Sequence, residues 1–238
     1  MKEENKTKEQ KAKKEITEKV VKKKLIIAII IWIINIILVC LCGYGVYYTE
    51  SSTIRAAKPI IYIYPTEETE LSVTLGKPDT LLVSYPNYKN TWNVKAEPNG
   101  TLTDVETGKK LYSLYYENRI NRNVKMEKEG FVIEGEKTAE FLDEKLEILG
   151  LNYKEREEFI IYWLPKLEAN KYNYIRFMTP EEIEDNMPLE FSVKPDTLIR
   201  VNMIFKGLNK PIEVKEQDLE PKERRGFTVV EWGATEIN

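Results

Sequence analysis

The chain has 238 residues, with 36 basic and 39 acidic side chains, two cysteines and no histidine. The lack of histidine excludes Ser-His-Asp and Cys-His nucleophilic sites and every histidine-ligated zinc site. Cys40 and Cys42 lie in one apolar stretch, which also excludes a zinc site with four cysteine ligands. The sequence has neither a Walker loop nor a GxGxxG motif, so it predicts no metal site and no cofactor.

The first element in chain order is an apolar segment at residues 25–46, which has no charged side chain and one strongly polar residue, Asn35. At about 1.5 Å per residue a helix of this length covers roughly 33 Å, enough to span a bilayer. We expect a transmembrane anchor. A cleaved signal peptide is the alternative, although its apolar region normally has only about 7–15 residues. Asn35 is expected to bond either a local partner or a neighbouring helix.

The flanks of this segment differ in charge. Residues 1–24 hold ten lysines and five glutamates, whereas residues 47–52 carry only Glu50. The positive-inside rule therefore predicts a single-pass protein of the cell membrane with a cytoplasmic N-terminus. The lysines are interleaved with glutamates and lack aromatic neighbours, so we interpret them as a topology signal near anionic lipid and predict no nucleic-acid binding. The resulting division is a head (1–24), a transmembrane helix (25–46), a connector (47–57) and an extracytoplasmic domain (58–238).

The first half of this domain predicts strands joined by tight turns. Apolar and polar residues alternate in several segments, as in strands that bury one face. Asn99-Gly100 is a hairpin signal, and the charged stretch 117–130 indicates a loop. The strands predicted here are 60–64, 71–75, 81–85, 92–96, 101–105, 111–116 and 131–134.

Two helices and further strands follow. Leucines at helical spacing and Gly150 predict a helix over 138–149, and Asn152 with Glu155 predicts the start of a second one that Pro165 ends or kinks. Adjacent helices between groups of strands favour an α+β fold, with a mainly antiparallel sheet that the helix pair covers on one face. The later predicted strands are 172–178, 189–193, 198–205 and 227–232, with connectors at 180–186 and 215–225.

Three segments carry a resemblance to a known family. They are KPIIYIYP at 58–65, YWLP at 162–165 and ERRGFTVVEWG at 223–233. The chain resembles an uncharacterised bacterial family of membrane-anchored or secreted domains with KPxIYxYP near the start and ERxGFxVVEWGG at the end. The resemblance covers about residues 58–236 and departs at Ala234, where a second glycine is expected. It implies one continuous domain and no particular activity.

Glu231 is the first candidate for chemistry because it lies in an apolar run. Alternation places it on the face of Val229, opposite Val230 and Trp232. A carboxyl group among apolar neighbours can serve as a general acid, and a second carboxylate about 5–10 Å away would suit glycoside hydrolysis. Candidate partners are Glu134 and Glu117. Alternatively, Glu231 pairs with an arginine such as Arg225 or lies on a solvated face.

Aromatic residues crowd the first hairpins and give a second candidate site. Such side chains stack on sugars and dominate interfaces, but they also fill ordinary sheets. The leading hypothesis is a membrane-anchored extracytoplasmic binding or assembly module with a surface protein or glycan as partner. The alternative is a carboxylate-dependent hydrolase acting on surface glycans. Beyond residue 24 the chain has 26 basic and 34 acidic side chains, and this net charge of −8 disfavours nucleic acids and anionic wall polymers unless a cation bridges the two. The candidate binding residues are Tyr62, Tyr64, Trp92, Tyr115 and Tyr116.

Overall fold

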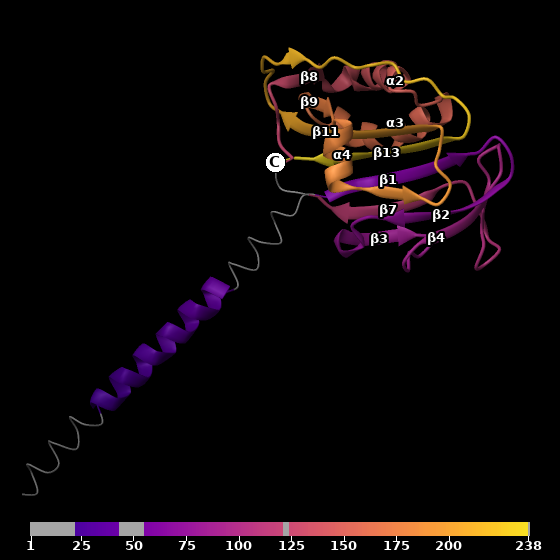
Figure 1. The fold of residues 1–238 in the computed structure, drawn as a ribbon. Coiled ribbons are helices and arrows are strands. Elements are labelled where there is room, and N and C mark those ends of the chain that lie inside the picture. The colour runs from indigo at the N-terminus through magenta and orange to yellow at the C-terminus, as the bar shows by residue number, and fades with distance from the viewer. Residues whose placement is uncertain (1–21, 43–54, 121–123, 238) are drawn as a thin grey trace, which may run out of the picture. The chain divides into compact units, whose positions relative to one another are not determined.

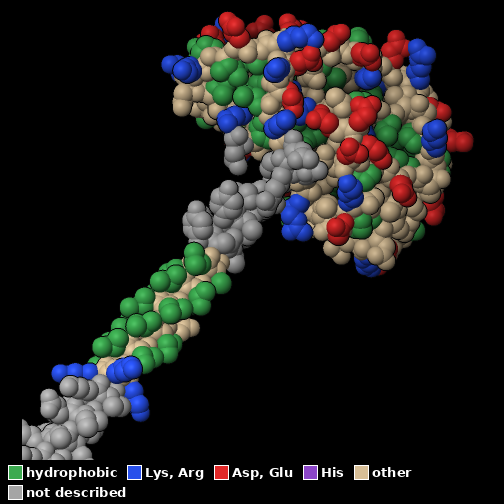
Figure 2. Space-filling view, turned by 60° about the vertical axis from the view of Figure 1, so that its left-hand side comes forward, with side chains coloured by type: hydrophobic (Ala, Val, Ile, Leu, Met, Phe, Trp, Pro, Cys, Tyr) green, Lys and Arg blue, Asp and Glu red, His purple; other side chains and the backbone are tan. Residues whose placement is uncertain are grey.

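A computed structural model describes residues 22–42, 55–120 and 124–237, which belong to two units, 1–52 and 53–238. The first unit contains the apolar helix Lys22–Cys42, which has 21 residues. This helix is long and apolar enough to cross a membrane, but the helix of a signal sequence has the same length and composition. Figure 2 shows hydrophobic side chains along this helix, with basic side chains at its start. Asn35 Nδ2 donates a hydrogen bond to the Ile31 carbonyl oxygen at 2.8 Å, so this amide has a local partner. The predicted residues 43–46 lie outside the described residues.

The second unit is built on two β-sheets, which confirms the α+β prediction (Figure 1). The larger sheet is mixed because β11 pairs in parallel with β13 and β12 with β8, while its other pairs are antiparallel. In spatial order its strands are β12 (Lys215–Glu216), β8 (Glu129–Glu134), β9 (Tyr172–Phe177), β11 (Thr197–Leu208), β13 (Thr228–Glu236), β1 (Arg55–Tyr64), β7 (Leu114–Arg119) and β3 (Leu81–Tyr85). The smaller antiparallel sheet has the order β10 (Leu189–Phe191), β2 (Thr69–Leu75), β4 (Trp92–Ala96), β5 (Leu102–Asp104) and β6 (Lys110–Leu111).

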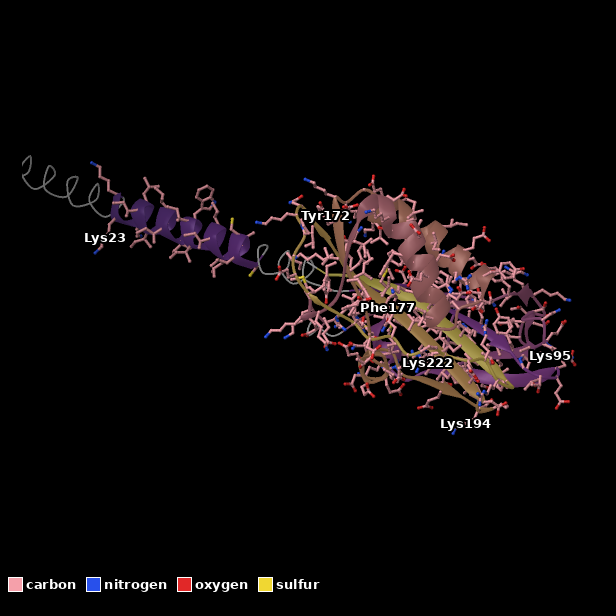
Figure 3. The ribbon with its side chains drawn as sticks, turned by 90° about the horizontal axis from the view of Figure 1, so that it is seen from above. Lys23, Lys95, Tyr172, Phe177, Lys194 and Lys222 are labelled. Carbon is pink, nitrogen blue, oxygen red and sulfur yellow. The ribbon has the colours of Figure 1, made fainter. Side chains whose placement is uncertain are left out.

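Helices α2 (Thr138–Ile148) and α3 (Tyr153–Glu168) cover one face of the larger sheet, and the smaller sheet packs on its other face. Figure 3 shows these helices over the strands of the larger sheet. The alternation of strand residues produces this layering. In β1, Ile60 and Tyr62 belong to the helix-side core, whereas Ile61 and Ile63 belong to the core between the sheets. A third, smaller core lies under α4 (Pro180–Asn186).

Local signals explain where the two adjacent helices meet. Gly150 has φ +89°, and the Leu151 N–H bonds the Leu146 carbonyl oxygen at 3.0 Å, which closes the end of α2. Asn152 and Glu155 then form a reciprocal capping box at the start of α3, as predicted. Of the two predictions for Pro165, the one that it ends the helix is wrong. Helix α3 continues to Glu168 because Leu167 is fully buried in the helix-side core.

Other differences have local reasons. The predicted connector 180–186 is the helix α4, because Thr179 and Glu182 form a second capping box and Ile183 is buried. The predicted strand 111–116 is divided by a bend at 112–113, and the second part, β7, continues to Arg119 into the predicted loop. The first strand begins at Arg55, so residues 55–57 of the predicted connector are part of the sheet. Connector residues 47–54 lie outside the described residues.

Candidate functional site

Glu231 lies in the interior of the domain, with only 3% of its surface exposed. Its Oε2 accepts a hydrogen bond from Arg200 Nε at 2.6 Å, and its Oε1 accepts one from the Tyr116 hydroxyl at 2.5 Å. Arg200 also donates to the Met187 carbonyl oxygen. The prediction that Glu231 pairs with an arginine is confirmed, but the partner is Arg200. Arg225, the arginine named as an example, pairs with Glu223, and the alternative of a solvated face is wrong. The partner is Arg200 because parallel pairing sets it directly beside Glu231.

The structure does not bring Glu231 together with the other two candidate carboxylates. Glu117 shares the helix-side face of β7 with Tyr115, whereas Glu231 and Val229 face the smaller sheet. Glu134 is three strands away from β13, roughly 14 Å at the usual strand spacing, and its carboxylate is 2.8 Å from the Lys137 ammonium. These carboxylates therefore have separate surroundings.

Four of the five candidate aromatic residues have partners inside the domain. The Trp92 indole donates to the Pro86 carbonyl oxygen at 2.8 Å, and the Tyr116 hydroxyl bonds Glu231. Hydroxyls of the other two bind carboxylates of α3, Tyr62 to Glu158 at 2.6 Å and Tyr64 to Glu155 at 2.8 Å. Tyr62 and Tyr64 therefore connect β1 to α3, whereas Tyr116 joins two strands of the larger sheet.

Tyr115, the fifth candidate, lines a pocket with a volume of about 530 Å³. This pocket, called here the Lys58 pocket, lies between α3, β1, the end of β3 and the bend between β6 and β7. Three of its tyrosines are exposed, so their rings are accessible from solvent. Tyr85 and Tyr112 belong to the aromatic residues that crowd the first hairpins, but they are not among the five candidate binding residues. Tyr162 and Lys58 were not predicted as site residues. The lining residues are Lys58, Ile60, Tyr85, Lys110, Leu111, Tyr112, Ser113, Tyr115 and Tyr162.

Lys58 sits at an irregularity in β1. Its φ of +55° is the only positive value of a non-glycine residue in the described ranges, and the register of β1 shifts here against both neighbouring strands. Such a backbone is unfavourable for a residue with a side chain and is retained where the surroundings impose it. The Lys58 N–H donates to Glu117 Oε1 at 3.3 Å. A Cβ at Gly233 would lie 3.1 Å from the Pro59 backbone, so the glycine gives the bulge its room.

The Lys58 side chain lies on aromatic rings. Its Nζ is 4.0 Å from the centroid of the Tyr162 ring and 5.6 Å from that of Trp232. Lys58, Tyr162 and Trp232 come from the three segments KPIIYIYP, YWLP and ERRGFTVVEWG, which are far apart in the sequence. The fold therefore brings these three segments together at the Lys58 side chain, with Trp232 buried beneath it and outside the pocket lining.

The surroundings change the proton affinity of the pocket's side chains. Burial lowers the pKa of Lys58, and the negative charge of Glu158 opposes this in part. Burial, aided by Glu117, raises the pKa of Tyr115, and burial with Glu158 raises that of Tyr112. These phenols therefore stay neutral near pH 7 and can donate hydrogen bonds.

Comparisons of the chain with protein-family models, curated proteins and solved structures found no match. Within the ranges that the structure covers, no three His, Cys, Asp or Glu residues are grouped so that they could hold a metal ion. The pocket offers aromatic faces, phenol hydroxyls and ammonium groups, which are groups that bind a ligand.

Proposed function

We propose that the chain is a single-pass membrane-anchored protein whose extracytoplasmic domain binds a surface glycan in the Lys58 pocket. The apolar helix and the lysines at its start support the anchor and its orientation. The observation that carries the binding role is the pocket itself, with accessible tyrosine rings and a volume of about 530 Å³. Pockets of a few hundred Å³ suit ligands as large as one or two sugar rings.

The chemistry of the lining favours a sugar over a protein partner. Tyrosine combines an apolar ring, on which the C–H face of a sugar can lie, with a hydroxyl that can bond sugar oxygens. A stable protein–protein contact needs about 800 Å² on each partner, usually with apolar side chains at its centre. The Lys58 pocket is instead concave and has exposed tyrosines with two lysines on its wall.

The surroundings of Glu231 favour binding over hydrolysis. General acid catalysis requires a carboxyl group within hydrogen-bond reach of the substrate. Glu231 is buried, and its two oxygens accept hydrogen bonds from Arg200 and Tyr116. We therefore assign this carboxylate a structural role and propose that the ligand binds in the Lys58 pocket.

The test is binding of the full-length chain, held in lipid nanodiscs, to an array of defined oligosaccharides. Tyr112→Ala removes a pocket ring that is 61% exposed, and Tyr153→Ala is the matched control because its ring is 66% exposed and lies outside the lining. An aromatic contact contributes about 0.5–1.5 kcal/mol, so Tyr112→Ala should weaken binding roughly twofold to tenfold. The control should bind like the original chain. The proposal would be contradicted if both variants bound the glycan equally well, or if the original chain bound none of the oligosaccharides on the array.

A further inference from the structure

Positive charge gathers at the Lys58 pocket. Lys58 and Lys110 line it, and the Nζ of Lys109 lies 4.9 Å from the centroid of the Tyr85 ring and donates to the Tyr85 hydroxyl. No acidic side chain is among the lining residues. This is unusual in a chain whose net charge beyond residue 24 is −8. Figure 2 shows many acidic side chains on the visible face of the domain.

Two carboxylates act on Lys58, one through its backbone N–H and one through its charge. Glu117 on β7 accepts the backbone N–H of Lys58 at 3.3 Å, and Glu158 on α3 accepts the Tyr62 hydroxyl at 2.6 Å. Lys58 forms no ion pair of 4.0 Å or less with any residue that the structure describes. Its ammonium lies over the rings of Tyr162 and Trp232, which replace part of its water.

We propose that the Lys58 pocket selects acidic sugars, whose carboxylate or phosphate group binds the ammonium groups of Lys58 and Lys110 while the sugar ring lies on the tyrosines. The inference rests on the proposed glycan binding and names the chemical class of the glycan. The acidic surface of the domain does not prevent this contact. Charges farther away than the Debye length of about 8 Å at physiological ionic strength are largely screened, whereas a bound anion is in direct contact with Lys58.

The pocket contains no arginine that would favour one anion by a paired set of hydrogen bonds. The ammonium group of a lysine is a point charge, so it can bind either a carboxylate or a phosphate. Both acidic groups are therefore tested separately. The probes are methyl β-glucuronide, glucose 6-phosphate and, as the neutral match, methyl β-glucoside.

Proton linkage gives the inference a second readout. An anion next to Lys58 stabilises the charged form, so the pKa of Lys58, lowered by burial in the free protein, rises when the acidic sugar binds. Binding is then strongest below the pKa of the free protein and weakens as the pH rises through it. Glu158 on α3 is a charged group that acts on Lys58 in the free protein. Tyr112 and Tyr115 line the same pocket, and because their pKa values are raised they stay neutral while Lys58 titrates.

Titration calorimetry with the full-length chain in nanodiscs tests the inference. The original chain should bind at least one of the two acidic sugars ten times more tightly than the glucoside at pH 7. Lys58→Met should remove this preference, while Lys58→Arg should keep it at pH values at which the preference of the original chain has weakened. Lys110→Met, a change on the exposed strand β6, should reduce the preference without any strain in β1. The control is Lys194→Met, an exposed lysine outside the pocket, which should behave like the original chain (Figure 3).

The outcomes separate the two proposals. If the glucoside binds as tightly as both acidic sugars and Tyr112→Ala weakens it, the inference is overturned and glycan binding stands. The inference is also overturned if Lys58→Met and Lys110→Met both keep the preference. If none of the three sugars binds and the oligosaccharide array is also empty, both proposals fail.

Discussion

Replacing Arg200 tests whether its ion pair with Glu231 stabilises the folded domain. Its side chain is 9% exposed and that of Glu231 is 4% exposed, with 2.6 Å between Arg200 Nε and Glu231 Oε2. Arg200→Met leaves the Glu231 carboxylate buried and without the arginine, while the hydrogen bond from the Tyr116 hydroxyl remains. Breaking a buried ion pair in this way costs about 3–5 kcal/mol of unfolding free energy. At roughly 2–4 °C per kcal/mol for a domain of this size, Tm should fall by about 6–20 °C.

Thermal unfolding of the full-length chain, followed by near-ultraviolet circular dichroism, measures this loss. Arg225→Met is the matched control because Arg225 pairs with Glu223 in solvent, with 80% of its side chain exposed, and such pairs contribute about 1 kcal/mol or less. The double variant Arg200→Met with Glu231→Gln should recover part of the lost Tm, since it removes the isolated charge. Equal Tm values for the Arg200 and Arg225 variants would refute the structural role of this pair.

Two further changes test the bulge and a helix start. Gly233→Ala places a methyl group 3.1 Å from the Pro59 backbone, so it should cost about 1–3 kcal/mol and weaken glycan binding in the array; an unchanged Tm with unchanged binding would show that the bulge tolerates the methyl group. Asn152→Ala removes the side chain that accepts the N–H groups of Lys154 and Glu155, so denaturant unfolding should show a loss of about 0.5–2 kcal/mol, and no loss would argue against the capping box.

The elements that follow a local rule were predictable from the sequence. Strand β4 buries Trp92, Val94 and Ala96 and exposes the residues between them, so its alternation is visible in the sequence. The start of α3 follows from Asn152 and Glu155 in the same way. The helix α4 was missed because its acidic composition resembles a connector, although Thr179 and Glu182 have the spacing of a capping box.

The candidate site depends on contacts that no local pattern contains. Arg200 is the partner of Glu231 only because β11 and β13 are parallel neighbours, and strand order is a property of the whole fold. Tyr112 lines the pocket because a bend interrupts a segment that alternates like one strand. For Lys58 the sequence contains one local signal, which is a lysine followed by a proline at the start of an apolar strand. Its position over Tyr162 and Trp232 required the structure.

The central claim is that the folded domain is anchored to the membrane on its outer side, and cysteine labelling tests it most directly. Cys40 and Cys42 are replaced by serine, and the exposed Lys194 is replaced by cysteine, so that the folded domain carries the single thiol of the chain. Intact cells are then treated with a membrane-impermeant maleimide. The account predicts labelling before lysis, on a full-length chain that stays in the membrane fraction after a carbonate wash. Labelling only after lysis, or a labelled domain that has lost the helix and left the membrane, would contradict it.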